Sequence, residues 1–252
     1  MKTTGNTILI TGGGSGIGRA LAEAFHQRGN QVIIAGRSQA ALDEVANANP
    51  GMAPAVLDVT DAHDIARFTQ QIVRDYPALN VLINNAGIMR AEDWTTDSVD
   101  TATAQATIAT NLLAPIQLTA ALLPQLRQQA ASTVVNVSSG LAFLPLAITP
   151  TYSATKAAIH SFSESLRHQL KDTSVEVIEI APPYVQTELM GAQQASDPRA
   201  MPLADFIDEV MQLLELHDAP EVLVQRVHRQ RFAAAQGQAA YQQLFVQVNT
   251  PR

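Results

Sequence analysis

Short apolar runs recur along the chain, and most of them are continuous rather than alternating with polar residues. Continuous runs are typical of strands that are covered on both faces of a parallel sheet. Turn-forming or polar residues separate these runs from one another. We therefore predict seven strands, at residues 7–11, 31–35, 53–57, 80–84, 133–137, 175–181 and 221–225.

Between the apolar runs, hydrophobic residues return at helical spacing. The stretch 17–29 places Ile17, Leu21 and Phe25 on one face and ends at Gly29, a natural C-terminal stop. Ser38 and Asp61 are candidate N-caps of the next two helices. The same spacing predicts further helices at 38–49, 61–76, 98–129 and 152–171.

Strand and helix alternate without a break, which predicts an α/β fold with a parallel sheet. Right-handed crossovers then give a single doubly wound, Rossmann-like domain over 1–252, with ligand at the carboxyl ends of the strands. Residues 188–203 are irregular in pattern, and we expect a mobile substrate lid there. The tail from about 226 holds a Gln/Ala-rich stretch, which we expect to be ordered.

The charge balance and the residue types exclude several classes of function. A net charge of −7, from 23 acidic and 16 basic residues, disfavours nucleic acid as a partner. The absence of cysteine excludes disulfides and thiolate sites, and the six histidines are scattered, so we expect no metal. We find no signal peptide and no apolar run near the ~20 residues that cross a bilayer, which predicts a soluble, cytoplasmic protein.

A glycine-rich turn, TGGGSGIG at 11–18, directly follows the first predicted strand. Glycines let the backbone approach a pyrophosphate, and the N-terminus of the following helix attracts an anion. The spacing runs through Gly12, Gly16 and Gly18, with Ser15 and Ile17 between them. The alternative is a turn that binds nothing, but a strand and a helix on either side favour dinucleotide binding.

The end of the second predicted strand indicates which dinucleotide is bound. An acidic residue there would take the ribose 2′-hydroxyl of NAD(H), whereas this chain has Arg37 and Ser38. Arg37 can pair with a 2′-phosphate and Ser38 can add a hydroxyl contact. We therefore favour NADP(H), with NAD(H) possible if Arg37 is only a solvated loop residue.

Tyr152 and Lys156 stand four residues apart in TYSATKA, a spacing that any helix places on one face. Other motifs in the chain indicate whether this pair has a function. They are TGGGSGIG, the Asp58–Val59 pair, NNAG at 84–87, Asn111, Ser139 and YSATK. Together, in this order, they resemble the classical short-chain dehydrogenase/reductase family over about residues 5–225, and APPYVQTE resembles its DltE-type branch. This family has a seven-stranded parallel sheet with helices on both faces.

The resemblance implies a catalytic role for four residues. Tyr152 is the general acid in carbonyl reduction and the base in the reverse direction. Lys156 lowers the tyrosine pKa, helped by the oxidised nicotinamide ring, and holds the nicotinamide ribose. Ser139 orients the substrate carbonyl, whereas the neighbouring Ser138 points the other way along the strand. Asn111 holds a water against Lys156, or is merely a polar residue at a helix bend.

The resemblance also implies contacts to the dinucleotide. Asn85, Ala86 and Gly87 line it beside the ribose, and Asp58 and Val59 hold the adenine. Tyr152 and Lys156 also contact the cofactor. After the sixth strand, Pro182 and Thr187 are expected next to the nicotinamide, with a proline at 183 where the family usually has glycine.

An apolar, aromatic set of residues follows Ser139 and surrounds Thr187. It suits a small or medium hydrophobic ketone, aldehyde or secondary alcohol, and ordinary core packing is the alternative for each member. The predicted substrate residues are Leu141, Phe143, Leu144, Tyr184, Leu189 and Met190, with Met89 and Trp94 as further candidates.

The sequence thus predicts an NADP(H)-dependent carbonyl reductase or alcohol dehydrogenase. The alternatives are an NAD(H)-dependent alcohol dehydrogenase of the same family and a non-catalytic nucleotide sensor or scaffold. A sensor would typically lack the tyrosine or the lysine, and this chain has both. The family implies a homodimer or homotetramer paired through the helices at 98–129 and 152–171, and we expect His160 and His168 on the surface or at that contact.

Overall fold

Seven parallel strands form one sheet in the order β3-β2-β1-β4-β5-β6-β7. The structure is a computed structural model that describes residues 1–216 and 219–250. The predicted α/β class, with its parallel seven-stranded sheet, is confirmed. The strands are β1 (Thr7–Thr11), β2 (Gln31–Gly36), β3 (Ala53–Val56), β4 (Leu79–Asn84), β5 (Ser132–Val137), β6 (Val175–Ile180) and β7 (Glu221–Val222).

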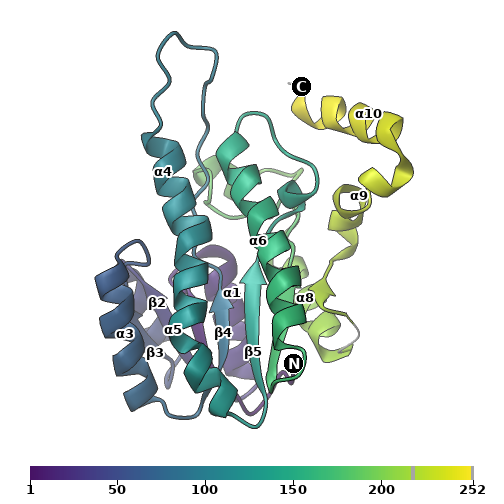
Figure 1. Cartoon of the computed structure of the whole chain (residues 1–252). Coiled ribbons are helices and arrows are strands. Elements are labelled where there is room, and N and C mark those ends of the chain that lie inside the picture. Colours follow the sequence, from purple (N-terminus) through teal and green to yellow (C-terminus); the bar gives the residue numbers. More distant parts are fainter. Residues whose placement is uncertain (217–218, 251–252) are drawn as a thin grey trace.

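Helices cover both faces of the sheet, so each face has its own apolar core. One core packs beneath α1 (Gly16–Gln27), α2 (Gln39–Ala48) and α8 (Leu203–Leu216). The other packs beneath α3 (Ala62–Asp75), α5 (Ala114–Gln128) and α6 (Pro150–Leu170), which stand on the near face in Figure 1. Coverage on both faces explains why the strands read as continuous apolar runs.

The predicted seventh strand is shorter than its sequence pattern indicates. Only Glu221 and Val222 pair with β6, and a 3₁₀ turn, η3 (Gln225–Val227), begins three residues later. Val224 and Val227 are fully buried, so this apolar run fills the core as a turn rather than as a strand. A short apolar run does not by itself distinguish the two.

The helix predicted at 98–129 is continuous from Ala102 to Gln128 and contains a π-helical turn. Its parts are α4 (Ala102–Ile108), η1 (Ala109–Leu113) and α5. By length and composition this helix could cross a membrane, which corrects our expectation that no apolar stretch is long enough. Polar residues interrupt its apolar runs in sequence, but its buried face packs on β4 and α3, as the core helix of a globular domain does.

The remaining segments lie beyond the carboxyl ends of β5 to β7. They are η2 (Gly140–Ala142), α7 (Ala192–Ala195), α9 (His228–Arg231), η4 (Ala234–Gln236) and α10 (Gln238–Asn249). Helix α10 lies at the upper edge in Figure 1 and contacts the domain through Leu244. The predicted lid at 188–203 contains α7, and Met201 within it forms a bridge with Val185, which lies just before it. Residues 217–218 and 251–252 of the predicted domain lie outside the described residues.

The strand order reverses direction at β1, because β2 lies on one side of it and β4 on the other. In open parallel sheets the connections from two such strands leave in opposite directions, which opens a crevice at their carboxyl ends. The glycine turn follows β1, and the NNAG stretch begins with the last residue of β4. The fold therefore brings two of the predicted motifs to one crevice.

Candidate active site

The glycine turn has the backbone geometry that its sequence predicts. Gly12 and Gly16 have φ angles of +69° and +52°, which side chains disfavour. A Cβ at Gly18 would lie 2.3 Å from the Gly12 carbonyl oxygen, so glycine lets α1 pack directly on the turn. Ser15 precedes α1 and its side chain makes no capping hydrogen bond. Its hydroxyl and the first amides of α1 are therefore available to an anion.

A cleft of about 280 Å³ opens beside this turn at the carboxyl ends of β1, β2 and β4. Predicted cofactor contacts make up half of its lining, namely Gly12, Ser15, Arg37, Ser38, Asp58, Val59, Ala86 and Gly87. Residues without a predicted role form the rest: Gly14, Gly36, Ala41, Leu42, Leu57, Thr60, Ile88 and Thr110. The cleft is thus built from the motifs predicted to hold the adenosine and pyrophosphate half of a dinucleotide.

Several predicted cofactor contacts lie outside this cleft. Asn85 turns its side chain toward the glycine turn, and its amide donates to the Thr11 carbonyl oxygen at 3.0 Å. Its backbone amide donates to the Thr11 hydroxyl. Asn85 therefore holds the turn in place, and its contact with the cofactor stays a prediction. Gly16, Ile17, Gly18, Pro182 and Thr187 also lie outside the cleft lining.

The adenosine end of the cleft carries a fixed arrangement of charges. Arg37 is exposed at the end of β2, and Ser38 caps α2 by accepting a hydrogen bond from the Ala41 amide. Hydrogen bonds from the Thr60 amide and hydroxyl, together with the positive charge of Arg37, lower the pKa of Asp58. The Asp58 carboxylate therefore lines this end of the cleft, and the Arg37 guanidinium beside it is exposed to solvent.

Sequence reasoning missed Thr60, although a signal for it was present. A threonine two residues after an aspartate commonly closes a turn onto the carboxylate, and Thr60 does so at 2.7 Å. Leu42 lies one helical turn after Ser38, so the capping position already placed it near the cleft. Thr110 depends on the π-helical turn, for which the sequence gives no local signal.

The end of β5 presents two serines to opposite faces of the sheet, as predicted. The Ser138 hydroxyl donates to the Glu179 carboxylate, whereas the Ser139 hydroxyl acts on Tyr152 and lowers the pKa of its phenol. The Ser139 hydroxyl also accepts from the Leu141 amide at 3.1 Å, which fixes its direction. Tyr152 is buried in the first turns of α6. The structure therefore places these two predicted catalytic side chains close enough for one to act on the other.

Lys156 lies one turn after Tyr152, and its ammonium is buried between α6 and β5. The Nζ atom donates to the Val137 carbonyl oxygen at 2.8 Å and lies 5.6 Å from the centre of the Tyr152 ring. Burial lowers the pKa of Lys156 to about 8, and the negative charge of Glu179 opposes this shift. A lysine so placed is ionised at neutral pH but sits near its titration point.

Without dinucleotide, the phenol of Tyr152 is not acidified, and its acidification by Lys156 together with the nicotinamide ring stays a prediction. Burial raises the pKa of Tyr152 to about 12, and the hydrogen bond from Ser139 offsets only part of the rise. Burial disfavours the charged phenolate, and the Lys156 ammonium is directed to the Val137 carbonyl oxygen. At neutral pH the phenol is therefore fully protonated, which is the form a proton donor requires.

Asn111 lies in the π-helical turn and is almost completely buried. Its side chain exchanges two hydrogen bonds of 2.9 Å with the amide and carbonyl groups of Ile88. It also lies 3.4 Å from the Thr155 hydroxyl on α6. A Cβ added to Gly87 would approach both the Asn111 amide oxygen and Lys156 Nζ, so Asn111, Gly87 and Lys156 converge. The predicted water between Asn111 and Lys156 remains a prediction.

The predicted substrate residues divide into two groups. Leu144 is fully buried against Ala233 and Leu244, so it belongs to the packing of the C-terminal segment and its assignment is corrected. Phe143 packs edge-on against His160, with Arg231 over its ring. Tyr184 and Leu189 are exposed, and Leu141 and Met190 are partly exposed. These last four can still face a substrate.

The loop after β6 is tied to the glycine turn. Thr187 lies beside Gly16, where an added Cβ would come within 3.6 Å of its methyl group. The buried amide of Gln194 donates to Thr187 and to the Val185 carbonyl, and accepts from the Met190 amide. Pro182 accepts a hydrogen bond from Gly140, just after Ser139. Gln194 thus anchors part of the predicted lid, and we found no sequence signal for it.

Residues 6–198 match the model of the short chain dehydrogenase family. The chain belongs to this family. It is 42% identical to the uncharacterized oxidoreductase DltE of Bacillus subtilis, over 99% of both chains, which agrees with the DltE-type resemblance of its sequence. The protein is thus an oxidoreductase of the DltE type by descent.

Solved structures agree with this placement. A short chain dehydrogenase from Burkholderia cenocepacia, solved in complex with NADP, is 27% identical and superposes with a TM-score of 0.82 over 100% of both chains. A short-chain dehydrogenase from Streptomyces avermitilis is 26% identical, with a TM-score of 0.81 over 97% of this chain and 98% of the other. The similarity extends through the C-terminal segment beyond the matched family region.

The buried ammonium of Lys156 serves the proposed reaction but should lower the stability of the fold. Replacing it in Lys156→Met should raise the free energy of unfolding at pH 7 by about 1–2 kcal/mol, after allowing for the lost hydrogen bond to Val137. The folded-state pKa lies below the unfolded one, so the wild type gains stability as pH rises from about 8 to 10.5. The advantage of the variant should therefore shrink over that window.

Urea denaturation at several pH values measures this difference. Lys171→Met is a matched control, because Lys171 is exposed at the end of the same helix, and it should change stability by less than about 0.5 kcal/mol. A Lys156→Met protein that is less stable than wild type at pH 7, or whose difference does not vary with pH, would contradict the burial account.

Proposed function

We propose that this protein is an NADP(H)-dependent carbonyl reductase or alcohol dehydrogenase. The observation that carries the proposal is a buried, protonated Tyr152 with the buried Lys156 ammonium 5.6 Å from its ring centre, next to the buried Ser139, which lowers the pKa of the phenol. A proton donor and a second hydroxyl meet there at the carboxyl end of the sheet. Carbonyl reduction needs these groups where the oxygen develops negative charge.

The residues around the cleft fit a dinucleotide. Gly12, Gly14 and Ser15 line it at the start of α1, where glycine leaves room for a pyrophosphate and the Ser15 hydroxyl is uncapped. The dinucleotide, when bound, supplies or accepts the hydride at its nicotinamide ring. Thr187, beside Gly16, would contact the carboxamide, and Lys156 would hold the adjacent ribose.

The side chains of this chain would then perform the proton chemistry. Ser139 donates to the carbonyl oxygen of the substrate and orients it. As the oxygen gains negative charge, Tyr152 transfers its phenolic proton to it, because an alkoxide is the stronger base. The Lys156 ammonium stabilises the phenolate that remains. Asn111, fixed by Ile88, would hold a water that returns a proton through Lys156.

The preference for NADP(H) rests on Arg37. It is exposed at the mouth of the cleft, where an acidic residue would repel a 2′-phosphate. The Burkholderia cenocepacia relative was solved with NADP, which supports the same choice. NAD(H) remains the alternative, because Asp58 places a negative charge near Arg37.

The substrate and the assembly follow from exposed apolar surface. Leu141, Tyr184, Leu189 and Met190 are apolar or aromatic and at least partly exposed, which suits a small or medium hydrophobic ketone or aldehyde. Ile108 and Leu113 are exposed on the long helix, which supports pairing of two copies through that helix and α6. A homodimer or homotetramer in the cytoplasm is the proposed form.

A second class of function is a nucleotide sensor that binds NADP(H) without turnover. Such a sensor would differ from the enzyme in having a catalytic group that is missing or points away from the site. The joint burial of Tyr152, Lys156 and Ser139, with the ammonium 5.6 Å from the phenol ring, favours the enzyme.

Tyr152→Phe should remove the proton donor and leave the fold unchanged. We expect kcat/KM for NADPH-dependent reduction of aryl ketones to fall by about 10³-fold, within the range of general acid catalysis. Tyr76→Phe, at the end of α3, is the control and should keep wild-type activity. NADPH binding, followed by fluorescence, should be retained in both. Equal residual turnover in wild type and Tyr152→Phe would favour the sensor.

Arg37→Asp should shift preference from NADPH toward NADH. Loss of a charge-assisted pair and gain of a repulsive carboxylate should lower the ratio of kcat/KM for NADPH over NADH by about 100-fold. Arg74→Asp makes the same charge change at an exposed site on α3 and should leave the ratio unaltered. A ratio that does not move in Arg37→Asp would show that the 2′-phosphate is not read by this residue.

A further inference from the structure

Glu179 carries a carboxylate that is completely buried in β6. Its side chain points to the same face of the sheet as Val175 and Val177, which belong to the apolar core beneath α6. A buried charge is costly unless its neighbours compensate it. The proposed proton chemistry has no role for this residue.

Two hydrogen bonds connect Glu179 to the elements that carry the catalytic side chains. One carboxylate oxygen accepts from the Ser138 hydroxyl at the end of β5. The other lies 2.8 Å from Nδ1 of His160 on α6. Ser138 precedes Ser139, and His160 lies one helical turn after Lys156. A single carboxylate thus bridges the end of β5 and the catalytic helix.

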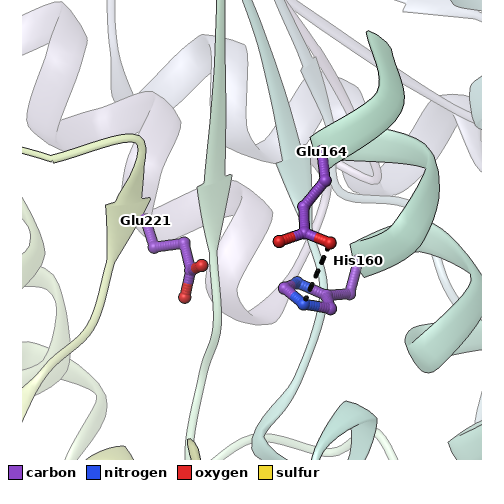
Figure 2. A group of neighbouring side chains, drawn as sticks. All are labelled: His160, Glu164 and Glu221. Atoms are coloured by element: carbon purple, nitrogen blue, oxygen red, sulfur yellow. Dashed lines mark ion pairs between the residues drawn. The ribbon is translucent and has the colours of Figure 1, made fainter. Parts of the chain in front are cut away.

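His160 itself is only partly exposed, whereas His168 is exposed, and a place for either at a subunit contact stays a prediction. Figure 2 shows His160 facing Glu164 of the same helix and Glu221 of β7. Nε2 lies 3.8 Å from the Glu164 carboxylate. The ligand atoms of these three residues lie within 4.8 Å of one another, as those of a metal site could.

The charges in this cluster are already paired. Arg231 binds both carboxylate oxygens of Glu221, at 2.6 and 2.9 Å. The Nδ1 atom of His160 is engaged by Glu179. The arrangement therefore argues for an ionic network around Glu179 rather than for a cation site.

Other charged groups also face Glu179. The Lys156 ammonium donates to the Val137 carbonyl oxygen, and the next residue, Ser138, donates to Glu179, so adjacent residues of β5 hold the two charges. The negative charge of Glu179 raises the pKa of Lys156. Arg167, also on α6, donates to the carbonyl oxygens of Val177 and Pro220 instead of to a carboxylate. Among the cations, Lys156 is the one that the proposed reaction uses.

We propose that Glu179 is a positioning residue that fixes the end of β5 against α6 and stabilises the ammonium form of Lys156. The proposal rests on the function proposed above. This role explains why a carboxylate is buried at this position. Burial alone would favour the neutral form of Lys156 near the pH at which the protein works, and the charge of Glu179 opposes that effect. The pKa of Lys156 is shifted by its burial beside the proposed site, which is where electrostatic support from a neighbouring charge is expected.

Glu179→Gln tests the proposal, because the amide keeps the size and hydrogen-bonding capacity of the side chain and removes its charge. The chain has three lysines, at positions 2, 156 and 171, so NMR of isotopically labelled lysine can follow each one. Lys156→Met identifies the resonance of Lys156. We expect the titration midpoint of Lys156 in Glu179→Gln to fall by about one pH unit below wild type.

The pH dependence of activity should shift with the Lys156 midpoint. Lys156 is charged below its pKa, so the alkaline limb of the kcat/KM profile of Glu179→Gln should move to lower pH by the same amount as the midpoint. A purely structural role would lower kcat without moving this limb. Glu176→Gln, an exposed residue on the same strand, is the matched control and should keep the wild-type midpoint. His160→Gln keeps a hydrogen-bond donor for Glu179 and leaves the charge of Glu179 in place. The titration midpoint of Lys156 in this variant should therefore equal that of wild type.

A midpoint of Lys156 that is unchanged in Glu179→Gln would overturn the proposal, whatever happens to activity. If Glu179→Gln does not fold, Glu179→Met fills the same volume without charge and carries the same prediction. The NMR measurement needs no turnover. A wild type without reductase activity would therefore refute the proposed function and still leave the effect of Glu179 on Lys156 measured.

Discussion

Burial of an ammonium and a phenol in one apolar interior is the constraint on which the site depends. Lys156 and Tyr152 are both almost inaccessible, and burial moves both pKa values away from ionisation. Each group therefore needs a specific partner: Ser139 for the phenol, and the Val137 carbonyl and the charge of Glu179 for the ammonium. The sheet supplies these partners, because β5 and β6 end beside α6.

The same logic organises the cofactor cleft. The change of direction at β1 opens a crevice, and glycine allows α1 to begin directly against the turn. Asn85 and Asn111 do not line the cleft, yet each hydrogen-bonds to backbone that borders it. The site is thus held by buried polar contacts behind the surface that a ligand would touch.

The sequence predicted what depends on local pattern. Continuous apolar runs located all seven strands, and the order of motifs identified the family before any geometry was known. It could not predict contacts between residues far apart in the chain. The bond from Ser138 to Glu179 spans 41 positions, and the inward turn of Asn85 depends on Thr11, 74 positions away. The high pKa of Tyr152 was missed for the same reason, because spacing reveals a neighbouring lysine but not burial.

The ionisation of Tyr152 tests this account most directly, and NMR of ¹³Cζ-labelled tyrosine measures it. The chain has four tyrosines, so Tyr152→Phe assigns the resonance. Without dinucleotide, the phenol should stay protonated to about pH 12, two units above free tyrosine. Saturation with NADP⁺ should lower its pKa, because a positive ring beside it favours the phenolate. A phenol that ionises as free tyrosine does, with and without NADP⁺, would contradict the account.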